Sequence, residues 1–262
     1  MDRVELLARF DLERRRPAVP RGYRIDSVGP VVRVVGEQCW VSFSDLDPAT
    51  ADRVVAEQAS YFRSLGREVE WKVYGHDRPV DLGDRLRAAG FRPDPSETLM
   101  VYDLARPLPV VALEEDMVVE RVRDSSGLAG AMAASEEAFG TGQGWRPDDP
   151  ARWLQDPDSV VFLARAHGTP IASARLEVPE GHQFAGLWGG GTSPAYRGRG
   201  VYRALVVARA ELARERGFRF LTVDALETSR PILERLGFEP MTSVTGWLLA
   251  PDEPENGTVP PG

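Results

Sequence analysis

A glycine-rich, basic segment between an apolar run and a helical pattern constrains the fold more than any other feature. The segment GGGTSPAYRGRG (residues 189–200) follows the strand-like run Phe184–Trp188. The helical pattern after it carries one apolar stripe, made of Val201, Leu205, Ala208 and Leu212. The sequence therefore predicts a strand, a tight turn and a helix N-terminus in direct succession.

This order of elements builds an anion-binding site. Unpaired backbone N–H groups at a helix start converge on one point, and the helix dipole adds partial positive charge there. Gly198 and Gly200 let the backbone approach a phosphate closely, while Arg197 and Arg199 supply full charges. The spacing excludes the phosphate-binding loop G-x-x-x-x-G-K-[ST] and the dinucleotide motif G-x-G-x-x-G.

The same segment resembles the acyl-CoA-binding motif Q/R-x-x-G-x-G/A of the GNAT superfamily of N-acetyltransferases. Arg197 fills its first position and Gly200 its fourth, whereas Tyr202 stands where the family has Gly or Ala. A second motif follows in the family's order: an apolar run at 218–225 and then PILERLGF at 231–238. The resemblance spans roughly residues 117–250. It implies a mixed α/β (α+β) fold, with a central, mostly antiparallel sheet flanked by helices.

The resemblance also implies acetyl-CoA as co-substrate and the amine of a small molecule as acceptor, acetylated by direct attack. The residues expected to bind acetyl-CoA are Thr192, Ser193, Arg197, Gly198, Arg199, Gly200, Val201, Tyr202 and Arg203. The acidic chain is compatible with cationic acceptors such as polyamines or aminoglycosides, although net charge says little about one pocket.

Acetyl transfer needs an oxyanion donor and a base. In the family the donor is a backbone N–H at the end of the fourth strand, which by register falls near Gly191 or Thr192, where Gly189–Gly191 suit a bulge. Glu227 is the first choice for the base and Asp224 the second. Three further carboxylates are also candidates: Glu136, Glu137 and Glu177.

The exit of the CoA thiolate is where the sequence departs furthest from the family. Leu233 replaces the tyrosine that many members use as general acid, and Leu226 replaces a common asparagine. Thr228 or Ser229 is a possible hydrogen-bond donor instead, although Ser229 is equally suited to cap a helix. The alternative hypothesis is therefore a non-catalytic acyl-CoA sensor or partner-binding module.

A short internal sequence repeat suggests two related domains. The segment LRAAGFRP (86–93) matches LERLGFEP (233–240), and each follows a strand and a helix. We predict a shortened, degenerate GNAT-like domain at 1–106, a catalytic domain at 107–250 and a disordered tail at 251–262. The first domain carries Asp45 and Asp47 where the second has its glycine turn, so it should repel phosphate; Asp47 suits a helix cap.

Composition limits the function classes. The net charge of −8 argues against a nucleic-acid surface, and neither a signal peptide nor a membrane-spanning run is visible. Cys39 is the only cysteine and the three histidines lack metal-ligand spacing, so we expect no metal. A cytoplasmic monomer or homodimer is the simplest expectation.

The remaining elements follow from periodicity and turn signals. We expect helices at 2–16, 48–65, 81–89, 124–139 and 150–155. We expect strands at 24–35, 38–43, 68–74, 98–104, 117–123, 159–166, 170–178 and 184–192.

Overall fold

Strand pairing, rather than position in the sequence, divides the chain into two units. In the computed structural model, β6 (Glu97–Asp103) pairs with β11 (Phe220–Ala225), and β12 (Glu239–Leu249) pairs with β4 (Val69–Tyr74). The first unit comprises Met1–Glu13 and Thr98–Met241, and the second comprises Arg14–Glu97 and Thr242–Gly262. The structure describes residues 2–16, 23–140, 142, 144, 145, 147 and 149–251.

These units interleave along the chain, whereas the predicted boundaries at 106/107 and 250/251 are sequential. The difference arises because residues 98–103 join the sheet of the first unit through β11, and residues 244–249 join the second through β4. The predicted tail lies outside the described residues except for Pro251.

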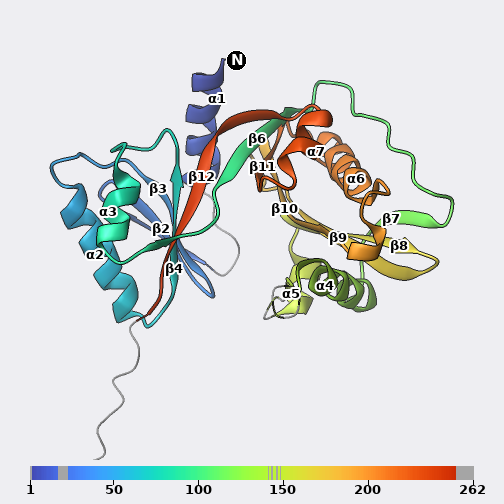
Figure 1. The fold of residues 1–262 in the computed structure, drawn as a ribbon, viewed down its shortest axis with the longest axis horizontal. Helices are drawn as coiled ribbons and strands as arrows, with labels where there is room; N and C mark the ends of the chain where they lie inside the picture. Colours follow the sequence, from blue (N-terminus) through green and yellow to red (C-terminus); the bar gives the residue numbers. More distant parts are fainter. Residues whose placement is uncertain are drawn as a thin grey trace, which may run out of the picture. The chain divides into compact units, whose positions relative to one another are not determined.

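The first unit is a sheet with helices on both faces (Figure 1). Its strand order is β6-β11-β10-β9-β8-β7, with β7 at Met117–Arg121, β8 at Ser159–Ala166, β9 at Thr169–Glu177 and β10 at Phe184–Thr192. Helices α4 (Ser125–Phe139) and α5 (Pro150–Gln155) lie on one face, and α6 (Val201–Glu215) and α7 (Arg230–Arg235) on the other. Only β10 and β11 run parallel, which confirms the predicted mixed, mostly antiparallel fold.

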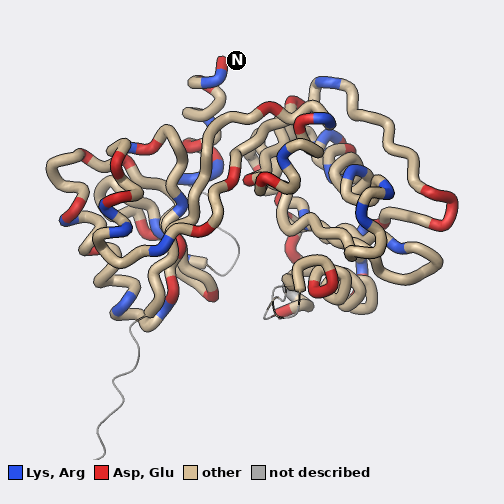
Figure 2. The backbone as a smooth tube through the Cα atoms, viewed as in Figure 1, with Lys and Arg blue, Asp and Glu red and all other residues tan. Residues whose placement is uncertain are grey.

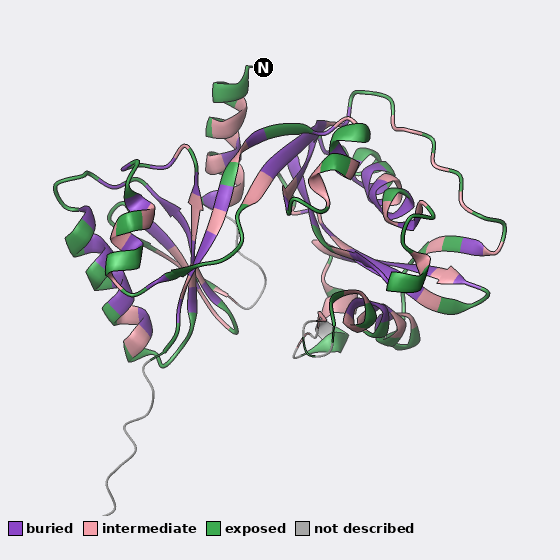
Figure 3. Cartoon of the chain, in the orientation of Figure 1, coloured by how far each residue is buried: buried purple, intermediate pink, exposed green. Residues whose placement is uncertain are grey.

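Local sequence explains where these elements begin. Asp124 caps α4 by accepting a hydrogen bond from the Gly127 N–H at 2.7 Å, so the cap is Asp124 rather than Ser125. The hairpin of β8 and β9 turns at His167 and Gly168, both with positive φ. The central strands are buried on both faces while the helices expose their outer surfaces (Figure 3).

The second unit has the strand order β1-β2-β3-β4-β12, and β5 pairs with β12. Its other elements are β1 (Arg24–Val28), β2 (Val31–Val35), β3 (Cys39–Ser44), α2 (Ala51–Ser64), α3 (Leu82–Ala88) and β5 (Arg92–Pro93). Two expectations are wrong here. The strand expected at 24–35 is a hairpin, because Gly29 adopts a φ of 58° and reverses the chain. Asp47 does not cap α2, because Thr50 holds the cap position and Asp47 accepts from the Ala49 N–H.

The helix expected at 2–16 is α1 (Arg3–Phe10) continued by a π-helical turn, η1, at Asp11–Arg15. Among the described residues, no helix is both long and apolar enough to cross a membrane. The same part of the chain holds no group of three or more metal-ligating side chains.

A buried ion pair organises the second unit. Arg15 and Asp77 are 3% and 8% exposed, and Arg15 Nη1 and Nη2 donate to the two Asp77 carboxylate oxygens at 2.8 and 2.7 Å. Arg15 Nε also donates to the Ser42 carbonyl, and the guanidinium stacks on Tyr74 at 4.1 Å. Asp77 in turn accepts from the Tyr74 N–H. The pair therefore ties the end of η1 to β3 and β4.

Replacing Asp77 with Ala should destabilise the second unit, because it leaves the Arg15 charge buried without its partner. Breaking such a pair costs about 3–5 kcal/mol, so amides of β3 and β4 should exchange at least about 100-fold faster with deuterium. Asp52→Ala removes an exposed partner of Arg85 and is the matched control. Equal exchange rates in the two variants would contradict the role given to Asp77.

Candidate functional site

Strands β10 and β11 begin as parallel neighbours and then part beside the start of α6. Their pairing joins Phe184–Gly186 with Phe220–Thr222 and extends no further among the described residues. One backbone edge of residues 187–192 therefore has no partner in β11. A parting of parallel strands next to a helix N-terminus is the kind of place where open α/β sheets bind ligands.

The end of β10 is bulged, as the glycine run predicted. Pairing with β9 shifts between Trp188 and Gly191, so that Gly189 and Gly190 together oppose the single residue Ala174. Gly191 is also required by close packing, because a Cβ on it would lie 2.7 Å from the Phe139 ring. The bulge therefore lets α4 approach the strand end.

The ladder fixes the direction of the Thr192 N–H. The Ser193 N–H donates to the Ile171 carbonyl on β9 at 2.8 Å, and Thr192 pairs with Ala172. Because N–H groups alternate in direction along an antiparallel ladder, the Thr192 N–H points away from β9 toward the unpaired edge. The Thr192 hydroxyl oxygen is buried and has no hydrogen-bond partner among the described residues.

The turn into α6 needs glycine at two positions. Gly198 and Gly200 have φ values of 78° and 86°, and Gly200 is the N-cap of α6. No side chain caps this helix, so the first backbone N–H groups of α6 keep free hydrogen-bonding capacity. A Cβ on Gly198 would meet nothing within 4 Å, so this glycine is required by conformation rather than by space.

The three arginines of the turn have different partners. Arg197 Nε donates to the Thr192 carbonyl at 3.1 Å and its Nη2 to the Ala138 carbonyl at 2.9 Å, so Arg197 ties the turn to β10 and α4. Arg199 pairs with Glu114, which raises the pKa of Arg199 and lowers the pKa of Glu114. Arg203 forms no ion pair among the described residues. Figure 2 shows Lys and Arg positions gathered in the region of α6, the helix labelled in Figure 1.

The structure separates the predicted base candidates. The Glu227 side chain is 77% exposed and lies 3.5 Å from Arg230. Asp224 is half-buried on β11, opposite Leu99. Glu137 on α4 accepts a hydrogen bond at 2.8 Å from the hydroxyl of Ser193, the residue that follows Thr192.

The two remaining carboxylates make different contacts. Glu136 on α4 accepts from the Gly142 N–H at 2.7 Å. Glu177 lies on β9 opposite Ser159 and Gly186, at the far end of the strand from the Thr192 pairing. Glu137 is thus the carboxylate that the structure joins to the end of β10.

Tyr202 places its phenol ring beside the β10 bulge. The sequence predicted only a role in CoA binding for this residue. Its ring lies against Gly190, where a Cβ would come within 3.0 Å of Cε2. Burial raises the pKa of Tyr202, while Arg209 and a hydrogen bond with Ser229 act in the opposite direction. Ser229 holds the N-cap position of α7 but its hydroxyl donates to the Leu226 carbonyl instead of capping the helix. Leu233 is fully buried in the core.

Two arginines at the bulge, Arg175 half-buried and Arg209 buried, were not predicted from the sequence. Arg175 lies on β9 and Arg209 on α6, and each lies against a glycine of the β10 bulge. The position of Arg209, four residues after Leu205 on the apolar stripe of α6, was the available signal. Burial lowers the pKa of Arg175 to about 10, and it likewise lowers the pKa of Arg209 to about 10.

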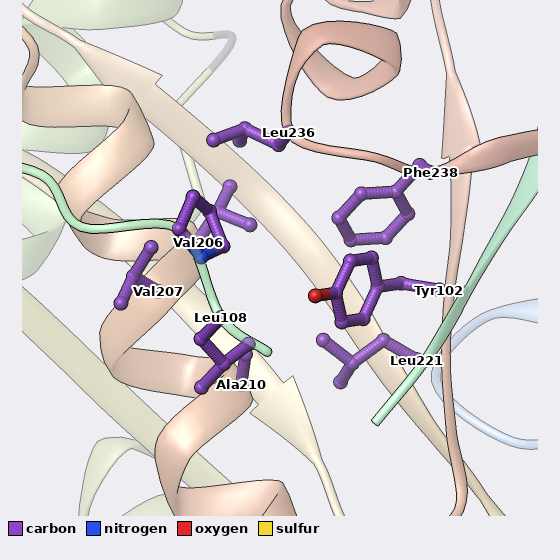
Figure 4. Close-up of a pocket in the computed structure, with 9 residues that line it drawn as sticks. Tyr102, Leu108, Val206, Val207, Ala210, Leu221, Leu236 and Phe238 are labelled. Atoms are coloured by element: carbon purple, nitrogen blue, oxygen red, sulfur yellow. The ribbon is translucent and has the colours of Figure 1, made fainter. Parts of the chain in front are cut away.

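A small hollow elsewhere in the first unit is lined by apolar side chains and by one tyrosine. It lies between α6, β11 and the segment after β6, and its lining is apolar: Tyr102, Leu108, Pro109, Val206, Val207, Ala210, Leu221, Leu236 and Phe238 (Figure 4). The Tyr102 hydroxyl, its one polar side-chain group, donates to the Pro107 carbonyl at 2.6 Å. This hollow is a packing gap of the core.

Comparison with known proteins finds a family match for the central part of the first unit. Residues 129–238 match the model of the acetyltransferase (GNAT) family. A histidine N-acetyltransferase from Oreochromis niloticus is 35% identical over 85 residues, which cover 32% of this chain and 25% of that protein. The match thus spans about a quarter of that relative.

Solved structures show the same fold. A GCN5-related N-acetyltransferase from Kribbella flavida superposes with a TM-score of 0.69 at 19% identity, over 89% of this chain and 91% of that one. A tandem GNAT protein from the clavulanic acid biosynthesis pathway gives 0.60 at 15% identity, over 90% and 86%. The predicted GNAT fold is therefore confirmed, and residues 129–238 of the chain match the acetyltransferase (GNAT) family.

Replacing Thr192 with Val should leave the stability of the free protein unchanged or raise it, because the buried hydroxyl lacks a partner. Ser135→Ala is the contrast, since the buried Ser135 hydroxyl accepts from the Trp145 N–H at 2.9 Å and its loss should cost about 1–3 kcal/mol. Urea unfolding followed by circular dichroism measures both. A loss in Thr192→Val equal to that in Ser135→Ala would show that the hydroxyl is bonded.

Proposed function

We propose that the GNAT-family domain transfers an acetyl group from acetyl-CoA to the amine of a small molecule by direct attack. The observation that carries this proposal is the parting of β10 and β11 next to the uncapped N-terminus of α6. The name of the Oreochromis niloticus relative, histidine N-acetyltransferase, supports an amine acceptor of small size.

The residues of the turn fit a pyrophosphate. Its phosphates would accept hydrogen bonds from the free N–H groups that follow Gly200, in the positive field of the helix N-terminus. Arg203 is placed to add charge, whereas Arg197 and Arg199 hold the shape of the turn through Thr192, Ala138 and Glu114. Ser193 and Val201 complete the predicted set at the two ends of the turn.

The reaction joins the acceptor nitrogen to the acetyl carbon and then breaks the carbon–sulfur bond. The Thr192 N–H would stabilise the oxyanion that forms between these steps; one such donor contributes roughly 3 kcal/mol. Glu137 would accept the proton that the attacking amine must lose, because it is hydrogen-bonded to Ser193 at the end of β10. Tyr202 would donate a proton to the departing thiolate, because its ring lies against Gly190 of the β10 bulge.

The tandem arrangement also remains a proposal. The second unit has Asp45 and Asp47 at its strand-to-helix junction, between β3 and α2. The corresponding junction of the first unit, between β10 and α6, carries the glycine turn. Asp45 forms an isolated bridge with Arg78, and the Leu46 N–H donates to the Arg78 carbonyl. We propose that this degenerate GNAT-like half binds no acetyl-CoA. Its two carboxylates would oppose a pyrophosphate at this place.

The experiment that tests the function measures two quantities on the full chain: acetyl-CoA binding by calorimetry and thiol release with a panel of small amines. Binding together with amine-dependent thiol release is expected. Binding without turnover on any amine would favour a non-catalytic acyl-CoA sensor. No binding would overturn both.

Gly200→Val should weaken acetyl-CoA binding at least tenfold, which is about 1.4 kcal/mol. The added side chain cannot adopt the φ of 86° without strain, and its Cβ would lie 3.4 Å from Arg203 Nη2, at the helix start where the phosphates would bind. Gly217→Val is the matched control, because Gly217 has a φ of 83° at the other end of α6. If both variants lose affinity equally, strain in the helix explains the effect and the site assignment fails.

Glu137→Gln should lower turnover about 100-fold while acetyl-CoA affinity stays unchanged, and the acidic limb of the pH–rate profile should disappear. Glu227→Gln is the control, since that exposed side chain should change turnover less than about twofold. Normal turnover in Glu137→Gln would exclude it as base and return the role to Asp224, Glu136 or Glu177.

A further inference from the structure

Two guanidinium groups flank the glycine bulge of β10. A Cβ on Gly189 would lie 2.9 Å from Arg175 Nη2, and a Cβ on Gly190 would lie 3.3 Å from Arg209 Nη2. The two cations come from different sides, because Arg175 lies on β9 and Arg209 on α6. The bulge thus has positive charge against both of the residues that oppose Ala174.

Neither charge is neutralised within the described part of the chain. Arg209 is 1% exposed, and its Nε and Nη1 donate only to carbonyl oxygens, those of Leu205 at 3.0 Å and Arg175 at 3.1 Å. Arg175 Nε is buried and has no hydrogen-bond partner. No described carboxylate forms an ion pair with either side chain; Glu177 acts on Arg175 only at longer range. A buried charge without a counter-ion is costly, so an anion that reaches Arg175 gains most of that energy.

Aromatic walls shape the space around Arg175. Its guanidinium carbon lies 4.9 Å from the centre of the Trp145 ring and 5.6 Å from that of Trp153. The two rings meet edge to face at 4.9 Å. They come from α5 and the segment before it, on the face of the sheet opposite α6. Rings in this arrangement hold the guanidinium plane and leave its edge as the polar surface.

We propose that Arg175 binds a carboxylate of the acceptor, with Arg209 as the positioning residue behind it. The acceptor would then be an amino-acid-like molecule whose amine and carboxylate lie close together. A planar guanidinium edge matches a carboxylate with two parallel hydrogen bonds. This inference rests on the proposed function, because it names the substrate class of the same site.

The spacing along β9 agrees with such an acceptor. Arg175 and Ala172, the residue that pairs with Thr192, are three residues apart on this strand, which is about 10 Å. An α-amino acid bridges a similar length: about 3 Å from guanidinium to carboxylate, about 3 Å to its amine, and about 3 Å to the carbonyl carbon under attack. The carboxylate anchor and the Thr192 N–H are therefore separated by the length of one small acceptor.

The test compares matched acceptors on the full chain with saturating acetyl-CoA. Each α-amino acid is paired with its carboxamide, with the amine that lacks the carboxyl group and with the aminophosphonate analogue. We expect kcat/KM for the amino acid to exceed that of the carboxamide about 100-fold. Equal or better turnover of the carboxamides or simple amines would overturn the proposal, and preference for the phosphonates would overturn the assignment to a carboxylate.

Variants separate the role of Arg175 from a structural one. Arg175→Gln should remove the preference for the amino acid while turnover of the carboxamide changes less than about threefold, and Arg175→Lys should restore part of it. Arg165→Gln is the matched control, because Arg165 lies on the neighbouring strand β8 and pairs with exposed Glu120. A uniform loss of turnover on all acceptors in Arg175→Gln would indicate packing against the tryptophans instead.

The design also separates this inference from the proposed function. Turnover of carboxamides or simple amines without preference for the acids leaves the acetyltransferase intact and removes only the carboxylate anchor. If no amine is turned over, calorimetric titration of the amino acids into the protein with CoA decides the anchor directly. Binding in the wild type that is lost in Arg175→Gln supports it, and its absence in the wild type overturns it.

Discussion

The parting of two parallel strands is the feature on which the first unit depends. β10 and β11 share only three paired positions, and the glycines that follow in β10 cannot continue a regular ladder. The bulge turns the strand end toward α4, and the same glycines admit Tyr202 and Arg209 from the other face. A regular, fully paired strand would close the edge on which the Thr192 N–H is available. The site is therefore made by interrupted pairing rather than by an added loop.

Charge is distributed unevenly around this interruption. At the turn, the arginines mainly hold the backbone in place: Arg197 binds two carbonyl oxygens and Arg199 pairs with Glu114. At the bulge, Arg175 is half-buried and Arg209 is buried, and no described carboxylate forms an ion pair with either. The overall charge of −8 therefore does not predict the positive charge at the bulge, because the local potential depends on the charged groups nearby.

The interleaved units show how pairing shapes the chain. β6 completes the sheet beside β11, and the end of β12 completes the sheet beside β4. Each strand thus pairs with a partner that follows or precedes it by more than one hundred residues. In the second unit the buried Arg15–Asp77 pair supplies a fixed connection between η1, β3 and β4. Such long-range contacts are specified by register and burial, which no local pattern reveals.

Local sequence determined the elements, the fold class and the position of the turn. Local patterns placed β8 and β10 at their observed bounds, and the glycine run predicted the bulge, because these depend on neighbouring residues alone. Tertiary structure decided which side chains meet. It set Glu137 against Ser193 and left Glu227 exposed, and it brought Arg175 and Arg209 to the same bulge from β9 and α6. Those contacts join residues far apart in sequence, and only the packing of helices on the sheet fixes which face each one occupies.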